Sequence, residues 1–381
     1  MKKKLLIIIH SLKKGGGAER VVSNLTIQLS KKYNINILTI YDFKNLYPYV
    51  GNYYSLKENL GLIRNLLNSL KFYTIIRPIR IYKLIRQISP DIIISNMELT
   101  NIYTILSKFI FRFKIPLIIV THTNPKIAYR KGKKYIRILL KIFYSLKLTD
   151  KIITVSKKIR KILEFEFGIK KNKLKTIYNS IDLERINELK RERLFKSKEI
   201  FKHDNLIKFI SIGSLRKVKG HKYLIDAFSE VKEQVPNSKL VIIGEGPLRR
   251  KLEKRIKKKN LVNDVFLLGL KKNPYKYLAK SDIFVFSSLY EGFGIVLLEA
   301  LSCEIPIIST DCETGPREIL DNGKYGLLVK VKDIDGLRNK MILLAKDKGL
   351  INYYTKDSLK RAEFFNKKRI MKKWIEIIES F

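Results

Sequence analysis

Two glutamates flank a glycine-rich turn in the second half of the chain. Glu291 stands directly before a Gly-Phe-Gly sequence at residues 292–294, and Glu299 follows Glu291 with seven residues between them. Because the apolar run Ile283–Phe286 precedes this turn, we expect the turn at the end of a buried strand. Glycines leave backbone N–H groups open to a ligand, and carboxylates accept hydrogen bonds from the vicinal hydroxyls of a ribose or another sugar. Glu299 lies in an otherwise apolar stretch, so its carboxylate either meets such a ligand or lies on a helix surface.

A run of basic side chains follows another apolar segment, residues 207–213. Arg216, Lys217, Lys219 and His221 supply four cationic or potentially cationic groups just before a helix-forming stretch. Such cations, together with the free N–H groups at the start of a helix, would bind a diphosphate. A solvated basic loop is the alternative interpretation in a chain this rich in lysine.

Three consecutive glycines, Gly15, Gly16 and Gly17, follow the first apolar run. At a strand-to-helix turn they would let backbone N–H groups approach a phosphate or a sugar closely, although a plain flexible turn is equally compatible. The sequence is not the G-x-G-x-x-G pattern of dinucleotide-binding domains, and the chain has no Walker motif. Neither a dehydrogenase nor a P-loop ATPase is therefore supported.

The elements that must position these loops are short apolar runs that alternate with helix-period stretches. This pattern indicates parallel sheets covered by helices on both faces. The expected strands are residues 4–9, 35–41, 91–95, 115–121, 151–156 and 174–178 in the first half, and 207–213, 239–244, 264–269, 282–287, 306–310 and 326–329 in the second.

These strands predict two doubly wound, Rossmann-like α/β domains. The predicted ranges are 1–183 and 184–365, with a charged linker at 184–204 and a C-terminal helix over 366–381. Ligands of such sheets bind at the carboxyl ends of the strands, so we expect a substrate cleft between the two domains.

The composition is strongly basic. The formal net charge of the 381 residues is +43, and residues 1–183 hold +27 of it. Nucleic acid, an anionic membrane surface and polyphosphate are candidate partners, and a coding bias toward lysine is the alternative explanation. Hydrophobic residues make up 45% of the chain, which excludes global disorder, and the apolar runs are too short to span a membrane. The two cysteines, Cys303 and Cys312, are too few for a zinc cluster and fit a reducing cytosol.

The Glu-x7-Glu element, preceded by Ser-Ser-x-Tyr at 287–290, resembles the retaining glycosyltransferases of the GT-B fold, and more narrowly their large glycogen-synthase-like fourth family. The resemblance covers nearly the whole chain. It extends to Gly-Gly-Ala-Glu at 16–19, Asn-Ser-Ile-Asp at 179–182, Gly-Glu-Gly-Pro at 244–247 and Phe-Leu-Leu-Gly at 266–269. The implied fold is α/β, with two Rossmann-like domains facing a cleft and a C-terminal helix that crosses back to the first domain.

The resemblance also implies roles for single residues on the donor side. Glu299 would bind the ribose of a nucleotide sugar, and Glu291 would hold hydroxyls of the donor sugar. Lys219 matches the family's lysine on the diphosphate, and Arg216 stands in for an arginine that the family places where this chain has Ser214. The remaining donor-binding positions are backbone sites at Gly244, Gly269, Gly292, Phe293 and Gly294.

On the acceptor side, His122 matches a family histidine near the reacting centre, so His122 and Glu291 are the candidate catalytic residues. A loop histidine is the alternative for His122. Gly16 and Gly17 would lie by the phosphate or the acceptor. A loop over residues 309–323 is similar to that of bacterial relatives that transfer N-acetylhexosamines to growing glycans.

The implied chemistry needs no metal and no cofactor. Departure of a nucleoside diphosphate requires neutralisation of charge, which Lys219, Arg216 and a helix N-terminus would supply. Asp333-Ile-Asp335 matches the Asp-x-Asp pattern of a metal site. It stands just before a C-terminal helix, where aspartate is an ordinary cap.

The acceptor side belongs to the basic half. Residues 126–175 contain 17 Lys or Arg and 3 acidic residues, together with apolar residues at 135, 136, 139, 140, 143 and 146. This basic amphipathic pattern is typical of a helix on an anionic membrane surface, or of an ordinary helix whose apolar face is core.

The sequence therefore predicts a cytoplasmic enzyme, peripheral on the inner face of the cell membrane. It would transfer a hexose or N-acetylhexosamine from a UDP-sugar to a surface glycan, a lipopolysaccharide or a lipid-diphosphate-linked oligosaccharide. A nucleotide-sugar epimerase of related fold is one alternative. A nucleic-acid-binding protein is the other, although no recognition-helix or RNA-stacking motif supports it.

Overall fold

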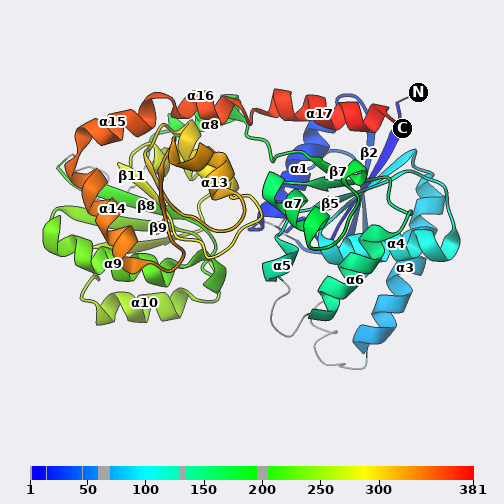
Figure 1. The fold of residues 1–381 in the computed structure, drawn as a ribbon, viewed down its shortest axis with the longest axis horizontal. Helices are drawn as coiled ribbons and strands as arrows, with labels where there is room; N and C mark the ends of the chain where they lie inside the picture. Colours follow the sequence, from blue (N-terminus) through cyan, green and yellow to red (C-terminus); the bar gives the residue numbers. More distant parts are fainter. Residues whose placement is uncertain (1, 14, 45, 59–68, 129–133, 195–204) are drawn as a thin grey trace. The chain divides into compact units, whose positions relative to one another are not determined.

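The computed structural model describes residues 2–13, 15–44, 46–58, 69–128, 134–194 and 205–381. The chain divides into two compact units (Figure 1). The first comprises Met1–Asn179 and Ile370–Phe381, and the second comprises Ser180–Arg369. Parts of the predicted basic segment 126–175 and of the predicted linker 184–204 lie outside the described residues.

A seven-stranded parallel sheet forms the centre of the first unit. Its order is β3-β2-β1-β4-β5-β6-β7. The strands are β1 (Lys4–Ile9), β2 (Asn34–Tyr41), β3 (Asn52–Glu58), β4 (Ile92–Asn96), β5 (Leu117–Thr121), β6 (Lys151–Thr154) and β7 (Leu174–Thr176). Ile7 of β1 pairs with Ile37 of β2 on one side and with Ile94 of β4 on the other, and all three side chains are buried. Consecutive residues Leu5 to Ile9 of β1 are also buried, and they point to alternate faces, so both faces of the sheet are covered at its centre, as the continuous apolar runs predict.

Helices connect these strands in sequence. They are α1 (Gly17–Leu29), α3 (Ser69–Ile88), α4 (Glu98–Phe111), α5 (Pro125–Ala128), α6 (Lys134–Ser145), α7 (Lys157–Phe165) and the short η1 (Lys171–Lys173). The terminal helix α17 (Lys367–Glu379) begins in the second unit, and its residues from Ile370 onward belong to the first. Its apolar residues Ile370, Trp374, Ile377 and Ile378 are buried, and Tyr33 Oη donates a hydrogen bond to Glu379 Oε1 at 2.5 Å. None of the helices, over the part of the chain that the structure describes, has the length and apolarity needed to cross a membrane.

The second unit contains a six-stranded parallel sheet in the order β10-β9-β8-β11-β12-β13. Its strands are β8 (Ile207–Ile212), β9 (Ser238–Ile243), β10 (Val265–Gly269), β11 (Ile283–Phe286), β12 (Ile307–Thr310) and β13 (Leu327–Val329). Its helices are α8 (Leu183–Lys190), η3 (Lys217–Lys219), α9 (His221–Gln234), α10 (Arg249–Lys258), α11 (Tyr275–Leu278), α12 (Ile295–Ser302), α13 (Pro316–Ile319), η4 (Asp321–Gly323), α14 (Ile334–Lys346), α15 (Lys348–Lys356) and α16 (Ser358–Glu363).

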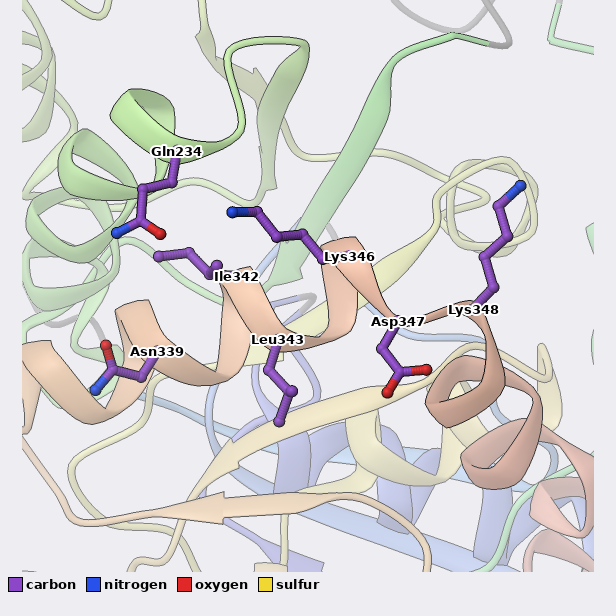
Figure 2. A pocket seen from close by; sticks show the side chains of 7 residues that line it. All are labelled: Gln234, Asn339, Ile342, Leu343, Lys346, Asp347 and Lys348. Carbon is purple, nitrogen blue, oxygen red and sulfur yellow. The ribbon is translucent and has the colours of Figure 1, made fainter.

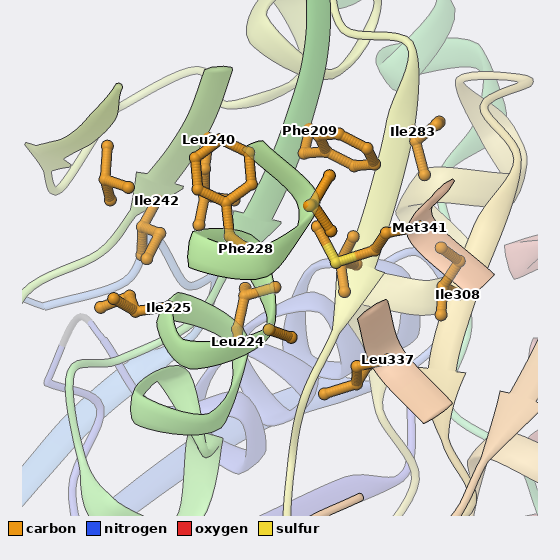
Figure 3. Packing of buried hydrophobic residues seen from close by; sticks show 14 of the residues in the cluster. Phe209, Leu224, Ile225, Phe228, Leu240, Ile242, Ile283, Ile308, Leu337 and Met341 are labelled. Atoms are coloured by element: carbon orange, nitrogen blue, oxygen red, sulfur yellow. The ribbon is translucent and has the colours of Figure 1, made fainter. Parts of the chain in front are cut away.

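The core of the second unit lies between this sheet and the helices α9 and α14 (Figure 3). Leu224 and Phe228 project from α9, four residues apart, so they lie on one face of the helix. Leu337 and Met341 do the same on α14. Burying a side chain of this size contributes about 1.5–3 kcal/mol, so these apolar stripes hold the strand ends in place.

The strand pattern is confirmed except at one edge of the first sheet. Strand β3 was not predicted, because its sequence, Asn-Tyr-Tyr-Ser-Leu-Lys-Glu, lacks a continuous apolar run. It pairs only with β2 and stands at the end of the sheet. An edge strand has a neighbouring strand on one side only, so it tolerates polar residues. These polar residues interrupt the apolar run by which a strand is recognised in a sequence.

Candidate active site

Loops from neighbouring strands meet at the carboxyl edge of the second sheet. Strands β8, β11 and β12 are adjacent and parallel, so the loops that follow them leave the sheet at the same edge. The amide of Leu289 donates to the carbonyl of Val218 at 2.7 Å, and Ser287 Oγ donates to the carbonyl of Lys219 at 2.9 Å. The basic loop and the Gly-Phe-Gly loop, which lie about 70 residues apart in sequence, are thereby joined.

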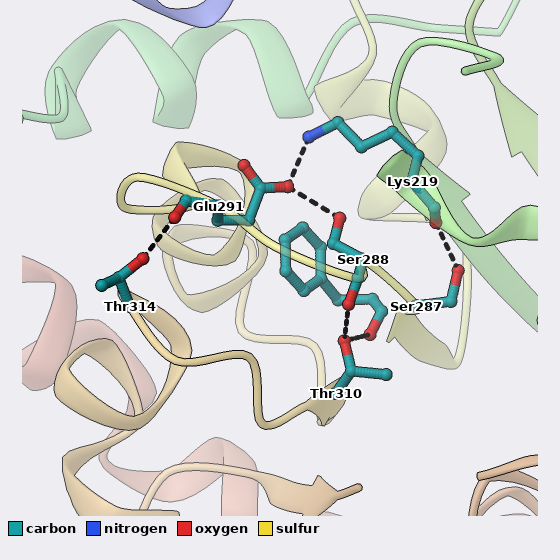
Figure 4. A network of polar contacts seen from close by, with 7 residues as sticks. Lys219, Ser287, Ser288, Glu291, Thr310 and Thr314 are labelled. Atoms are coloured by element: carbon teal, nitrogen blue, oxygen red, sulfur yellow. Dashed lines mark hydrogen bonds and ion pairs between the residues drawn. The ribbon is translucent and has the colours of Figure 1, made fainter. Parts of the chain in front are cut away.

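Lys219 and Glu291 form an ion pair at this junction (Figure 4). Lys219 Nζ lies 2.5 Å from Glu291 Oε1, and the two side chains are 22% and 14% exposed. Ser288 Oγ donates a second hydrogen bond to Glu291 Oε1 at 2.7 Å. The lysine predicted for the diphosphate and the glutamate predicted for the sugar are thus in direct contact, and a carboxylate is held there by both a cation and a hydroxyl.

The backbone of this loop is fixed from the next strand. Thr314 Oγ1 donates to the carbonyl of Glu291, and Thr310 Oγ1 donates to the carbonyl of Ser288 at 2.5 Å (Figure 4). Sequence reasoning gave neither threonine a role, because they are about 20 residues from the loop that they support and the contact exists only in the folded sheet. Thr310 is the last residue of β12 and Thr314 lies in the loop that follows it, and this place at the carboxyl edge is the signal that points to them.

Glu299 lies on α12 and is only 2% exposed. The helix-surface interpretation is therefore wrong. Tyr275 Oη donates a hydrogen bond to Glu299 Oε1 at 3.1 Å. Tyr275 is the first residue of α11, which follows β10, and it was not predicted. A buried carboxylate held by polar partners is suited to hydrogen-bond the hydroxyls of a ligand at this edge.

Glycine is required at two positions of this edge. Gly220 has a φ of 64°, and a Cβ atom there would lie 2.0 Å from the carbonyl oxygen of Ser287. Gly244 has a φ of 150°, and a Cβ atom there would lie 2.0 Å from the carbonyl oxygen of Gly213. The amide of Gly244 also donates to the carbonyl of Gly269 at 3.0 Å, which brings the two predicted nucleotide-side loops together.

The other predicted donor positions differ in their surroundings. The Phe293 ring is buried against Phe365, so any contact of this residue with a ligand would pass through its backbone between Gly292 and Gly294. Arg216 is exposed and makes no side-chain hydrogen bond or ion pair with the residues that the structure describes. The structure therefore does not bring Arg216 into the Lys219–Glu291 cluster, and its role on a diphosphate stays a prediction.

His221 corrects one expectation about the basic loop. Its ring is buried at the first position of α9, and burial, reinforced by nearby Lys219, lowers its pKa to about 3. The ring is therefore neutral at pH 7 and supplies no positive charge. The loop contributes three cations, not four.

In the first unit, His122 follows β5 and is 8% exposed. Its Nε2 lies 3.1 Å from Asn96 Oδ1, and burial lowers the pKa of the ring to about 4. Thr123, the next residue, donates both its amide and its hydroxyl to the buried carboxylate of Glu98, at 3.1 and 2.8 Å. His122 is thus a buried, neutral ring in the loop directly after β5, where it contacts the last residue of β4, and its catalytic role stays a prediction.

The glycine loop of the first unit leads into a helix as predicted. Gly16 is the N-cap of α1, and Gly17 is its first residue. Gly15 has a φ of 110°, and its amide donates to Tyr47 Oη at 3.1 Å. Glu19 stands in the first turn of the helix, where a carboxylate is favourable.

Two further features lie apart from these loops. Asp333 caps α14 by accepting a hydrogen bond from the amide of Gly336 at 2.8 Å, which confirms its interpretation as a helix cap. A shallow hollow of 570 Å³ is lined by Gln234, Asn339, Ile342, Leu343, Lys346, Asp347 and Lys348 (Figure 2). Because α9 and α14 end there, the hollow lies at the amino edge of the sheet, opposite the loops described above.

Two family descriptions match this chain in succession. Residues 15–185 match Glycosyltransferase Family 4, and residues 191–361 match Glycosyl transferases group 1. An uncharacterized glycosyltransferase of Methanocaldococcus jannaschii is 38% identical over 80% of this chain and 82% of its own length. A Campylobacter jejuni protein is 32% identical over 96% of this chain and 97% of its own length. Its name is N-acetylgalactosamine-N,N'-diacetylbacillosaminyl-diphospho-undecaprenol 4-alpha-N-acetylgalactosaminyltransferase.

Solved structures match the fold along the full chain. Anabaena HepE in complex with UDP and glucose superposes with a TM-score of 0.80, at 18% identity and 100% coverage of both chains. The lipopolysaccharide outer core galactosyltransferase WaaB superposes with a TM-score of 0.73, at 20% identity and 99% coverage of both chains. At these identities the likeness shows the fold alone, which is GT-B.

Proposed function

This chain belongs to the family 4, group 1 glycosyltransferases, and we propose that it transfers a hexose or N-acetylhexosamine from a UDP-sugar to a lipid-diphosphate-linked or surface glycan. Transfer proceeds with retention of configuration and without a metal ion. The observation that carries this proposal is the junction of Lys219, Glu291 and Ser288 at the carboxyl edge of the second sheet, with buried Glu299 on the helix that follows.

The donor binds at this edge by exchanging partners with the protein. The ammonium of Lys219 moves from Glu291 to the diphosphate, where it neutralises the charge that develops on the leaving group. Glu291, released from part of its ion pair, accepts hydrogen bonds from hydroxyls of the sugar. Arg216 is exposed near the start of η3 and adds a second cation to the diphosphate. These cations replace the metal ion, and no resident cofactor is required.

The nucleoside is held by the buried polar groups of α12 and by backbone. The carboxylate of Glu299 binds the ribose hydroxyls while Tyr275 keeps it oriented. The backbone after Gly269 reads the base, and the N–H groups of Gly292, Phe293 and Gly294 face the sugar. A structure solved with UDP-glucose, again HepE, has the same fold with a TM-score of 0.79, which supports a UDP-linked donor.

The acceptor is a lipid-diphosphate-linked glycan. His122 and the Gly16-Gly17 turn, both at carboxyl ends of strands in the first unit, are its proposed contacts. The names of relatives support this substrate class. The Campylobacter relative is named for a diphospho-undecaprenol acceptor, and a 29% identical Escherichia coli relative is named as a UDP-Gal:alpha-D-GlcNAc-diphosphoundecaprenol alpha-1,3-galactosyltransferase.

We further propose that the enzyme works at the inner face of the cell membrane through α6. The helix divides its apolar residues between two faces. Ile136, Leu140 and Tyr144 are buried, whereas Ile138 and Ile142 are 61% and 51% exposed. Exposed apolar side chains within residues 1–183, which carry a net charge of +27, are suited to an anionic lipid surface.

A transfer assay tests this function. The enzyme is incubated with UDP-glucose, UDP-galactose and their N-acetylated forms, together with polyprenyl-diphosphate-linked oligosaccharides, and products are identified by mass spectrometry. We expect transfer of one sugar in the α configuration, retained in EDTA and lost in Glu299→Gln. Glu253→Gln, an exposed glutamate on α10, is the charge-matched control and should remain active. Absence of transfer from every donor would falsify the proposal.

A further inference from the structure

The side chain of Asn96 is fixed by two backbone carbonyls and one ring. Asn96 is the last residue of β4, and it is 1% exposed. Its Nδ2 donates to the carbonyls of Ile8 and Ile94, each at 3.3 Å, and its Oδ1 lies 3.1 Å from His122 Nε2. All of its polar atoms are therefore engaged in a buried setting, where unpaired groups are costly.

These contacts determine which way the amide points. The reverse orientation would place the amide oxygen against two carbonyl oxygens, neither of which can donate a hydrogen bond to it. The oxygen therefore faces His122. Because a carboxamide oxygen only accepts hydrogen bonds, His122 Nε2 must carry the proton.

The ring is neutral, so it carries one proton only. It is buried, its pKa is lowered to about 4, and burial is the cause. With the proton on Nε2, the other nitrogen, Nδ1, has a free lone pair. No group among the described residues hydrogen-bonds Nδ1, so its lone pair is left for a ligand at the carboxyl edge of the first sheet.

The surrounding backbone holds this arrangement rigidly. Met97, next to Asn96, has a φ of 73°, a conformation that residues with a side chain rarely adopt. The buried carboxylate of Glu98 fastens Thr123, next to His122, by two hydrogen bonds. Asn101 Nδ2 adds a bond to the carbonyl of Val120 at 3.0 Å. The residue that follows Asn96 and the residue that follows His122 therefore both help to hold the two side chains in contact.

We propose that Asn96 is a positioning residue that fixes His122 as the Nε2–H tautomer, so that Nδ1 accepts a hydrogen bond from a hydroxyl group of a substrate. His122 then orients a sugar by accepting a hydrogen bond on a neutral ring, and it does not act as a cationic hydrogen-bond donor. The hydroxyl belongs to a substrate if the enzyme acts as proposed above, whereas the tautomer does not depend on that function.

The tautomer can be read directly. The chain has four histidines, so a ¹⁵N-histidine-labelled sample gives a sparse long-range ¹H–¹⁵N spectrum, in which His122 is assigned from its loss in His122→Asn. At pH 7 we expect a protonated Nε2 and an unprotonated Nδ1 in the free enzyme. A protonated Nδ1, or a mixture of tautomers, overturns the proposal. This result stands even if the enzyme transfers no sugar in any assay.

Two substitutions separate positioning from mere support. Asn96→Ala removes the acceptor and should mix the tautomers. Asn96→Asp keeps an acceptor on Nε2, but its charge should hold the ring as a cation, which occupies Nδ1 with a proton. We expect kcat to fall at least tenfold in both variants while the KM for the nucleotide sugar changes less than threefold. Wild-type kcat in Asn96→Asp overturns the proposal. A circular dichroism spectrum and a melting temperature like those of wild type verify that the first unit is folded. If the variants do not fold, the wild-type spectrum decides alone.

Discussion

At the scale of residues, the candidate site is built from charges that satisfy one another before any ligand arrives. Lys219 and Glu291 are partly buried, and each would be costly to leave alone in that setting. Their contact, supported by Ser288, stabilises the loop and holds both side chains at the proposed donor site. A substrate that offers a diphosphate and hydroxyls can replace this contact without leaving either charge unpaired.

The support from Ser288 predicts a defined loss. Ser288→Ala removes one hydrogen bond to the Glu291 carboxylate, and a hydrogen bond to a charged group contributes about 1.5–3 kcal/mol. We expect kcat/KM to fall roughly tenfold or more, measured in steady-state transfer assays. Ser281→Ala, which removes a hydroxyl bonded to the carbonyl of Tyr277, is the control and should leave kcat/KM unchanged. Equal values for the two variants would show that Glu291 does not need this hydroxyl.

Buried neutral histidines predict a loss of stability in mild acid. The pKa of His221 is lowered to about 3, while an unfolded histidine takes up its proton near pH 6.5. Between pH 7 and pH 5 the His221 ring therefore binds a proton in the unfolded chain but not in the folded chain. The free energy of unfolding falls by about 2 kcal/mol as a result. In denaturant titrations, His221→Gln should show a correspondingly smaller fall than wild type. Lys222→Gln leaves the buried ring of His221 in place and should keep the full fall. If His221→Gln also keeps it, the ring is not neutral when folded.

Residues that could be predicted from the sequence are those whose neighbours along the chain give the signal. Glu291 and Glu299 stand at a fixed spacing beside glycines, and His122 stands at a strand end. Asn96, Tyr275, Thr310 and Thr314 were missed because each touches a site residue that lies 22 or more residues away in sequence. Their roles depend on which strands are adjacent in the sheet, and a single sequence does not reveal that spatial order.

At the scale of elements, the strands and helices predicted from the spacing of apolar residues agree with the burial in the structure almost throughout. Strands β8 to β13 follow the predicted runs. The inner strands β9, β11 and β12 are almost wholly buried, as expected where helices cover both faces of a sheet. The exceptions are the edge strand β3 and the helix α6. In α6 the period indicated one apolar face, whereas the structure places alternate apolar residues in the core and in the open.

The core stripe of α14 predicts a contrast within one helix. Met341 is fully buried between the sheet and α9, whereas Leu343, two residues later, is 39% exposed. Met341→Ala should lower the free energy of unfolding by about 2–5 kcal/mol, because it leaves a cavity. Leu343→Ala should cost less than about 1 kcal/mol. Denaturant titrations of both variants check the difference, and similar losses would contradict the described packing.

The exposed residues of α6 predict binding to lipid. We expect the enzyme to co-sediment with vesicles rich in phosphatidylglycerol, less at high salt, and not with vesicles of phosphatidylcholine. The double substitution Ile138→Glu and Ile142→Glu should weaken binding at least tenfold. Val262→Glu, at a similarly exposed apolar position of the second unit, should bind like wild type. Undiminished binding of the double variant would exclude α6 as the lipid-facing helix.

At the scale of the whole molecule, the chain passes between its two units twice, after Asn179 and after Arg369. The segments on the second-unit side of both passages are tied together. The amide of Ile181 donates to the carbonyl of Phe365, and the amide of Lys367 donates to the carbonyl of Ile181, each at 2.9 Å. Lys367 Nζ also pairs with Asp182 at 2.8 Å. Both connections therefore start from one hydrogen-bonded cluster, which includes the Asn-Ser-Ile-Asp segment.

The net charge of +43 is explained only in part by named sites. We propose that Lys219 and Arg216 bind one diphosphate and that the excess of cations over residues 1–183 faces a membrane. Both matched family descriptions are of glycosyltransferases.

The central claim is that the carboxyl edge of the second sheet binds a uridine diphosphate through Glu299 and Lys219. Calorimetric titration of UDP into wild type, Glu299→Gln and Glu253→Gln tests it most directly. We expect UDP to bind wild type and Glu253→Gln with the same affinity, and Glu299→Gln at least tenfold more weakly. Equal affinity in all three proteins, or no binding of UDP to wild type, would contradict it.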